Sequence, residues 1–353
     1  MDAGFWAQLP RPFAALAPME DVTDTVFRQM VGKIGGTCLP VGRPDVYFTE
    51  FTNVEGICHA LEISPVLRAT PSLIKEGEGG RFDPVLRRLI FSSAERPIVA
   101  QIWGTQPQKF YEAAKVVAGL GFDGIDVNLG CPQKDILKQG ACAAMIGDKA
   151  RVGEILAAVS EAGLPVSVKT RLGIKKIITE EWIGWLLEQN PAAVTVHLRT
   201  AAEMSAMPAH WEEMGKIIKL RNSLYPHPGP PPSLGGGNGR KGVLVIGNGD
   251  VKDWLDGVRK CEEYGGDGFM IGRGILVNPA AFDKSGRELS RSDRIKLLLI
   301  HLNLWHQTWG EERDFQIMKK FVKAYINGFE GARELRAKMM AARTRADVVE
   351  LAA

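Results

Sequence analysis

Residues 166–171 read VSVKTR and residues 194–199 read VTVHLR. Both are short runs rich in β-branched residues, and a helix-prone segment, 180–189, lies between them. Strands that alternate with helical segments predict βαβ units and a parallel sheet. The same alternation continues toward both ends of the chain, and it decides the fold class.

Eight β-rich runs occur before about residue 280, and most are followed by a helix-prone stretch. The runs are 12–16, 46–48, 98–103, 124–128, 166–170, 194–198, 243–247 and 268–272, and the helix-prone segments are 24–31, 107–120, 151–162, 180–189, 209–221 and 251–264. Eight strands that alternate with helices predict an α/β fold, the (β/α)8 TIM barrel. A doubly wound sheet is the alternative, but it would more often carry a glycine fingerprint after its first strand, and LAPMED (16–21) is not one.

The β-rich pattern stops after Asn278-Pro279, and apolar residues then recur at helical spacing through about residue 345. We therefore expect a barrel domain over 1–283 and a small all-helical domain over 284–353. A Pro/Gly-rich segment, HPGPPPSLGGGNGRKG (227–242), precedes the seventh strand. Because this composition builds no core, we expect a flexible surface insertion at the bottom of the barrel.

Composition places the chain among ordinary globular proteins. It has 353 residues, of which 45% are hydrophobic and 24% charged, and no apolar run is long enough to cross a bilayer. The N-terminus has no signal-peptide pattern, so we expect a cytoplasmic protein without membrane contact. Five scattered cysteines without a CxxC pair argue against a disulfide framework and against a metal site.

Charge is distributed unevenly along the chain. The net charge is +3, but residues 284–353 carry 14 Lys and Arg against 9 Asp and Glu. A basic C-terminal region on a nearly neutral body suggests a polyanionic partner. On composition alone, a solvated helical surface is the simpler interpretation.

Polar residues occur where the predicted strands end, which is where barrel enzymes carry their chemistry. Alternate side chains share a face, so Ser167, Lys169 and Arg171 point one way, and so do Thr195, His197 and Arg199. We expect Lys169 and His197 in register at one rim, where two cations would favour an anionic or electron-rich ligand.

Glycine-rich turns follow the last two predicted strands. GNGD (247–250) follows the seventh, with Asp250 as a candidate helix cap, and GRG (272–274) follows the eighth, with Arg273 as a cation. Paired at these strand ends, they predict a site for the phosphate of a nucleotide or flavin.

DVNLGCP (126–132) holds Cys131 in a tight loop after the fourth predicted strand. No histidine lies nearby in sequence to activate this thiol as a nucleophile. A thiol is mostly protonated at neutral pH, so Cys131 can act as a general acid. Cys142, among small apolar residues, is expected to be packed.

Seven motifs, in order, carry a family resemblance. APMEDVTD (17–24), VAQIWG (99–104), DVNLGCPQKD (126–135), KTR (169–171), HLRT (197–200), IGNGD (246–250) and IGRG (271–274) resemble those of the FMN-dependent tRNA-dihydrouridine synthases. The resemblance covers about residues 12–280 and includes the layout of a barrel followed by helices.

The resemblance implies roles for individual residues. Cys131 would be the proton donor, and Asn128 and Arg199 would place the uracil ring. The FMN-binding residues would be Pro18, Met19 and Glu20 beside the flavin ring, Gln101, Lys169 and His197 on its polar atoms, and Asn248, Gly249, Asp250, Gly272 and Arg273 around the ribityl chain and phosphate.

The implied activity is reduction of the C5–C6 double bond of uridines in tRNA. NADPH, or NADH, would reduce FMN, hydride would pass to C6 of uracil, and Cys131 would protonate C5. The C-terminal helices would bind tRNA, no metal is needed, and we expect a monomer. Two alternatives remain: an FMN barrel that acts on a free small molecule, of dihydroorotate or enone type, and an RNA-binding barrel without catalysis.

Overall fold

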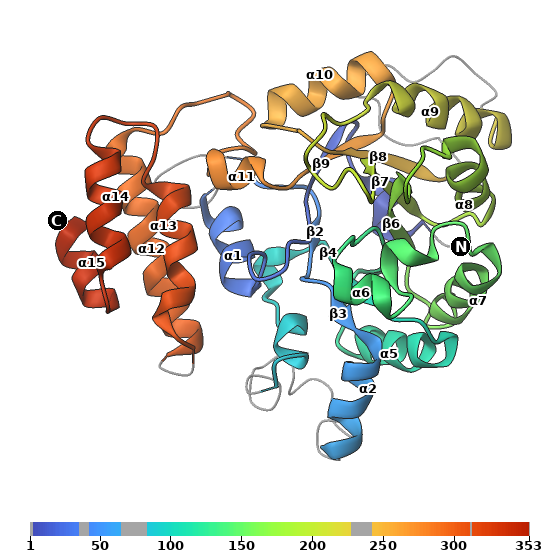
Figure 1. Cartoon of the computed structure of the whole chain (residues 1–353), viewed down its shortest axis with the longest axis horizontal. Coiled ribbons are helices and arrows are strands. Elements are labelled where there is room, and N and C mark those ends of the chain that lie inside the picture. Colours follow the sequence, from blue (N-terminus) through green and yellow to red (C-terminus); the bar gives the residue numbers. More distant parts are fainter. Residues whose placement is uncertain (1–2, 35–41, 65–82, 227–241, 311–312, 353) are drawn as a thin grey trace.

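The computed structural model describes residues 3–34, 42–64, 83–226, 242–310 and 313–352. Eight parallel strands form a barrel, as predicted, with the order β1-β9-β8-β7-β6-β5-β4-β2 (Figure 1). The strands are β1 (Phe13–Leu16), β2 (Tyr47–Phe48), β4 (Ile98–Trp103), β5 (Gly124–Leu129), β6 (Val166–Gly173), β7 (Ala193–Thr200), β8 (Leu244–Asn248) and β9 (Gly268–Ile271). A bridge between Ala15 and Val46 closes the ring between β1 and β2. The two-residue strand β3 (Thr52–Asn53) pairs with β4 outside this path.

Helices cover the outside of the barrel (Figure 1). They are α1 (Thr25–Ile34), α2 (Val54–Ile63), α5 (Pro107–Gly119), α7 (Lys149–Ser160), α8 (Gly184–Glu188), α9 (Glu212–Leu224) and α10 (Trp254–Tyr264), with short helical turns between them: Leu86–Leu89, Ser93–Glu95, α6 (Lys134–Lys138), Cys142–Met145 and α11 (Gly274–Val277). The segment predicted as one helix over 180–189 instead begins as a π-helical turn, Thr179–Ile183, before α8.

The α10 helix begins at Trp254, later than the predicted residue 251. Asp253 is its N-cap, and its side chain accepts a hydrogen bond from the backbone N–H of Asp256. The prediction that Asp250 caps this helix is therefore wrong. The residues between β8 and α10 are left as a loop at the mouth of the barrel.

The lower end of the barrel is closed by the N-terminal 3-10 helix, Gly4–Gln8. Trp6 is fully buried and its ring lies 6.0 Å from that of Phe13 and 6.3 Å from that of Phe48. Apolar side chains from the strands, such as Val99 and Ile246, complete the same cluster. With this end filled by apolar residues, polar groups from the strands are concentrated at the opposite, carboxyl end.

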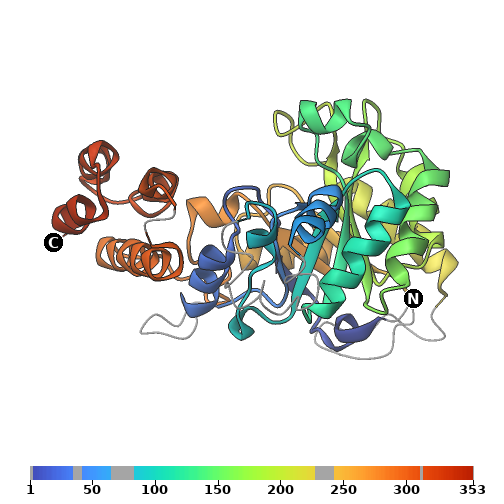
Figure 2. The ribbon, with the colours of Figure 1, turned by 90° about the horizontal axis from the view of Figure 1, so that it is seen from below.

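The C-terminal helices form a separate cluster beside the barrel (Figure 2). They are α12 (Arg291–Trp309), the 3-10 helix Phe315–Met318, α13 (Lys319–Tyr325), α14 (Ala332–Ala341) and α15 (Arg345–Ala352). The rings of Phe27 in α1 and Phe321 in α13 stack at 5.3 Å, and Arg313 Nη1 lies 3.0 Å from Asp24 Oδ2. The C-terminal helices are therefore packed on the barrel through α1 and not merely tethered to it.

The expected boundary at 283/284 falls between α11 and α12. The predicted insertion, 227–242, lies outside the described residues apart from Gly242. Across the parts of the chain that the structure describes, no helix combines the length and apolar character that a membrane span requires.

Candidate functional site

A cavity of about 1100 Å³ opens at the carboxyl ends of the strands. All residues that the sequence singled out as site residues line it: Pro18, Met19, Glu20, Gln101, Asn128, Cys131, Lys169, His197, Arg199, Asn248, Gly249, Asp250, Gly272 and Arg273. They lie on β4 to β8, or in loops that follow strands of the barrel, so only the closed barrel brings them together. A cavity of this size accommodates a cofactor and part of a substrate.

Lys169 is the ammonium group on the wall of this cavity. It lies on β6, and its Nζ donates a hydrogen bond of 3.2 Å to Asn248 Oδ1. Asn248 is itself held by a 2.9 Å hydrogen bond from its Nδ2 to the carbonyl oxygen of Met270. Burial and the nearby Arg171 lower the pKa of Lys169 to about 8. At neutral pH the side chain is still charged and has donors left for a ligand.

His197 is neutral, contrary to the expectation of a second cation at the rim. Burial lowers its pKa far below the usual range, and Lys169, Arg171, Arg199 and Arg273 lower it further because they repel a positive imidazole. Arg199 Nη1 lies 3.2 Å from His197 Nε2. Since an arginine only donates, Nε2 is the acceptor and Nδ1 carries the ring proton.

The expected register of Lys169 with His197 is also wrong. On the β6–β7 ladder, Lys169 pairs with Thr195, and His197 pairs with Arg171. Lys169 therefore lies one side-chain level deeper in the barrel than His197. Lys169, Arg171 and His197 all line the cavity, as strand parity predicts.

Arg199 is engaged by the protein on all three of its nitrogen atoms. Besides its contact with His197, Nη2 lies 2.5 Å from Asp250 Oδ2 and Nε donates to the carbonyl oxygen of Met207. Only 2% of Arg199 is exposed. This arrangement suits a residue that holds the loops after β7 and β8 better than one that contacts uracil.

The loop after β8 requires glycine at position 249. Gly249 has φ of +123°, and a Cβ there would lie 2.8 Å from the Cβ of Ala209. Trp211 Nε1 donates a 2.8 Å hydrogen bond to the Gly249 carbonyl oxygen, and Asp250 Oδ2 accepts one of 2.9 Å from the Ala209 N–H. The exposed Arg273 lies beside this loop, with Nη2 4.0 Å from Asp250 Oδ1. Glycine thus lets this turn pack closely against Ala209, with a cation next to it.

Cys131 lies at the mouth of the cavity in a loop whose backbone is held by the side chain of Asn128. Asn128 Oδ1 accepts 3.0 Å hydrogen bonds from the N–H groups of both Gly130 and Cys131. Burial raises the pKa of the Cys131 thiol above its usual value. The group therefore keeps its proton at neutral pH and can donate it. Cys142 is fully buried, as expected of a packed residue.

Arg171 was not among the predicted site residues, although it lines the cavity. Its Nε donates to the carbonyl oxygen of Gly130 at 2.7 Å, and its Nη1 to those of Thr200 and Met204 at 3.0 and 3.2 Å. Within the described part of the chain nothing accepts a hydrogen bond from its Nη2. Its parity with Lys169 was visible in the sequence, and this was the available signal.

Other lining residues carried no sequence signal. Met204 and Val277 are 55% and 69% exposed and form apolar parts of the rim, and Lys252 adds a cation. They lie in the segments after β7, β8 and β9, whose paths follow from tertiary contacts. No group of three or more His, Cys, Asp and Glu side chains that could hold a metal ion occurs among the residues described here.

Comparisons with known proteins give a consistent result. The dihydrouridine synthase (Dus) family model matches residues 15–224 and 238–353. The "Probable tRNA-dihydrouridine synthase 2" of Bacillus subtilis (strain 168) is 42% identical over 344 residues, which are 96% of this chain and 93% of the relative. The "Probable tRNA-dihydrouridine synthase" of Staphylococcus aureus (strain COL) is also 42% identical, over 96% of this chain and 92% of its own.

A search of solved structures finds only distant similarity among its leading matches. Morphinone reductase superposes with a TM-score of 0.45 and 11% identity, over 76% of this chain and 84% of its own. This similarity is too weak to bear on function.

Proposed function

The chain belongs to the dihydrouridine synthase family, and on this premise we propose that it reduces the C5–C6 double bond of uridines in tRNA. FMN is the cofactor and NADPH, or NADH, the reductant. The protein acts in the cytoplasm, where its substrate resides, and as a monomer.

The residues of the cavity fit FMN. The ammonium of Lys169 makes one hydrogen bond within the described chain, to Asn248, and so has donors for an electron-rich ring. Gly249 gives the loop after β8 a backbone conformation with positive φ where the phosphate would lie, and Arg273 adds a charge there. Pro18, Met19, Glu20, Gln101, His197, Asn248, Asp250 and Gly272 complete the binding residues. When bound, FMN accepts electrons from the nicotinamide and supplies the hydride that adds to C6 of uracil.

Cys131 supplies the proton. Addition of hydride to C6 leaves negative charge on C5 and O4, and the new C5–H bond forms as the S–H bond of Cys131 breaks. The raised pKa of Cys131 keeps the proton available, and Arg171 and Lys169 are the cations near the thiolate that results. This placement of a protonated thiol on a hydrogen-bonded loop at the cavity is the observation that carries the proposal.

Asn128 and Arg171 are the residues that place the uracil ring. Asn128 lines the cavity beside the Cys131 loop that it holds, and Arg171 has Nη2 available. Arg199 does not contact the uracil ring itself; it holds Asp250 and the neutral His197 in place. A guanidinium near the pyrimidine stabilises the charge that develops on its oxygen atoms.

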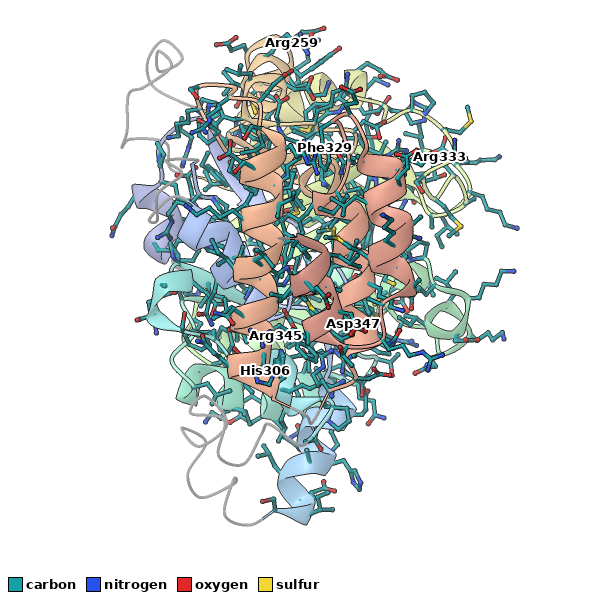
Figure 3. All side chains as sticks on the ribbon, turned by 90° about the vertical axis from the view of Figure 1, so that its left-hand side faces the viewer. Arg259, His306, Phe329, Arg333, Arg345 and Asp347 are labelled. Carbon is teal, nitrogen blue, oxygen red and sulfur yellow. The ribbon has the colours of Figure 1, made fainter. Side chains whose placement is uncertain are left out.

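The C-terminal helices bind the body of the tRNA. Their exposed cations include Lys323, Arg333, Lys338 and Arg343. Arg333 lies toward one end of the helices and Arg345 toward the other, so basic side chains are spread along this face (Figure 3). A free pyrimidine would need no such surface, and this favours tRNA over a small-molecule substrate.

The test compares Cys131→Ala with Cys261→Ala, which removes a buried thiol in α10, away from the cavity. Single-turnover reduction of unmodified tRNA by the pre-reduced enzyme should slow by roughly 10²–10⁴-fold in Cys131→Ala only. Reduction of FMN by NADPH should be unchanged in both. Equal rates for the two variants, or reduction of free uracil compounds but not of tRNA by the unaltered protein, would overturn the proposal.

A further inference from the structure

Three buried polar residues lie side by side on neighbouring strands at the base of the cavity. Asp126 on β5 pairs with Gln101 on β4 and with Ser167 on β6. Asp126 and Gln101 are fully buried and Ser167 is 1% exposed. Gln101 reaches the cavity, whereas Asp126 and Ser167 do not line it. Burying a carboxyl group in the core of a barrel costs free energy, so its presence there indicates a role.

A chain of hydrogen bonds connects Asp126 to the backbone of Cys131. Asp126 accepts from Ser167 Oγ at 2.6 Å and from Gln101 Nε2 at 2.7 Å. Gln101 Oε1 accepts from Asn128 Nδ2 at 2.8 Å. Asn128 Oδ1 then accepts from the N–H groups of Gly130 and Cys131, both at 3.0 Å.

Both ends of this chain determine how its amides are oriented. A carboxylate only accepts, so Gln101 must turn Nε2 toward Asp126 and Oε1 toward Asn128. Backbone N–H groups only donate, so Asn128 must turn Oδ1 toward them and Nδ2 toward Gln101. Without the carboxylate, Gln101 Nε2 would be a buried donor without this acceptor. The orientation of Asn128 would then be lost, and the Cys131 loop would keep only the hydrogen bond from Arg171 to Gly130.

Asp126 also faces a charge. Lys169 lies on β6 two residues beyond Ser167, the strand partner of Asp126, and so one side-chain level above Asp126 on the same face. Its charge acts on the Asp126 carboxyl, whose uncharged partners are Gln101 and Ser167. Burial raises the pKa of Asp126 to about 6, and Lys169 opposes that rise. At neutral pH the two are a carboxylate and an ammonium, and Arg171, which repels Lys169, is the next cation outward.

We propose that Asp126 is a positioning residue of the reaction: through Gln101 and Asn128 it orients the Cys131 loop, and its negative charge supports the ammonium of Lys169. This rests on the function proposed above, since it assigns the residue behind the proton donor and behind a cofactor contact. Neither role requires Asp126 to touch substrate or cofactor.

Two substitutions separate the two roles. In Asp126→Asn, the side-chain oxygen can still accept from Gln101 while Nδ2 donates to Ser167 Oγ, so the hydrogen-bond chain survives and only the charge is lost. In Asp126→Ala both are lost. Thr195→Val is the matched control, because the Thr195 hydroxyl is buried on the neighbouring β7 without a hydrogen-bond partner among the described residues.

The first measurement is alkylation of Cys131 by iodoacetamide in the apoprotein, followed by mass spectrometry. Asp126→Ala should raise the alkylation rate by about tenfold, because a held loop is released and its thiol becomes more accessible. Asp126→Asn and Thr195→Val should alkylate like the unaltered protein. If Asp126→Ala also alkylates like the unaltered protein, the hydrogen bonds from Asp126 through Gln101 and Asn128 do not orient the loop, and the proposal is overturned.

The second measurement is the pH profile of single-turnover tRNA reduction. The unaltered enzyme should lose rate below about pH 6, as Asp126 is protonated. Asp126→Asn should abolish this acid limb and lower the rate at pH 7.5, with KM for tRNA unchanged. An acid limb retained in Asp126→Asn would overturn the charge role. If the unaltered protein does not reduce tRNA, the proposed function is wrong. The alkylation experiment still tests the role of Asp126 in orienting the loop, because it does not depend on tRNA reduction.

Discussion

Arg171 Nε donates a 2.7 Å hydrogen bond to the carbonyl oxygen of Gly130, the residue before Cys131. A strand-end arginine on β6 thus holds the loop after β5. Through Nη1 the same guanidinium also holds Thr200, the last residue of β7, and Met204 in the loop that follows. One buried side chain therefore connects the loop of the proton donor to the end of β7 and the loop that follows it. A lysine cannot make these hydrogen bonds together, because its single ammonium lacks the several N–H groups that the planar guanidinium directs at both segments.

We predict that Arg171→Lys slows tRNA reduction by at least about tenfold, because a buried, charged hydrogen bond to the Cys131 loop is removed. FMN content should not change, since the FMN-binding residues are elsewhere. The measurement is single-turnover reduction together with the flavin spectrum. Arg151→Lys, at an exposed position in α7, is the control. If both variants react at the same rate, the role given to Arg171 is wrong.

We predict that Gly249→Ala lowers the affinity for FMN. The new Cβ meets Ala209 at 2.8 Å in a backbone conformation that alanine rarely adopts, so the loop must shift. Gly215→Ala is the matched control, because its Cβ would meet nothing within 4 Å and α9 should gain about 0.5–1 kcal/mol of stability. Titration of the apoproteins with FMN by flavin fluorescence compares them. Equal dissociation constants would show that this turn does not form the FMN site.

Glu50 should make stability depend on pH. It is buried, and burial, then Asp24 and Glu20, raise its pKa to about 7 from 4.5. The folded state therefore holds a proton that the unfolded state releases near pH 4.5. The stabilisation from this proton is present below about pH 4.5 and is lost as pH rises through about 7.

Glu50→Gln should remove this loss. The free energy of unfolding of the variant, minus that of the unaltered protein, should rise between pH 5 and pH 8. The rise should be on the order of 1 kcal/mol for each unit by which the pKa of Glu50 is raised. Thermal unfolding at both pH values measures it, and Glu181→Gln, at an exposed position, serves as the control. A difference between variant and unaltered protein that is the same at pH 5 and pH 8 would contradict the prediction.

The exposed cations of the C-terminal helices should control tRNA affinity. Lys320 is not a suitable target, because it is half-buried beside Asp21, Asp24 and Glu50 and its pKa is lowered by burial. The combined variant is therefore Lys323→Gln, Arg333→Gln and Lys338→Gln. Its affinity for tRNA should fall, and the slope of log K against log salt should become shallower by at most about 0.9 for each phosphate that the variant no longer neutralises.

The matched control neutralises Lys115, Arg151 and Lys219, which are exposed on α5, α7 and α9 of the barrel. Gel shifts at several salt concentrations compare the two triple variants. NADPH oxidation should be unchanged in both, since both leave the cavity intact. If the two variants bind tRNA equally well, the C-terminal cations are only solvated and tRNA is held by the barrel loops.

Much of the architecture was predictable because it depends on local patterns. Side chains alternate along a strand whatever its neighbours are, so the parity of VSVKTR and VTVHLR already showed which residues share a face. Parallel strands end at one side of a barrel, so residues as distant as Gln101 and Arg273 could be expected at one site. The roles assigned to these residues are still predictions.

The amino-acid sequence by itself determined the order of strands and helices, the barrel and the set of polar residues at its mouth. Only the tertiary structure decided what those residues do to one another. His197 is neutral because it is buried and several cations surround it, Arg199 holds Asp250, and Asp126 orients Gln101 and, through it, Asn128. Charge state and hydrogen-bond direction depend on burial and on partners from other strands. No short stretch of sequence contains that information, because the partners meet only when the barrel closes.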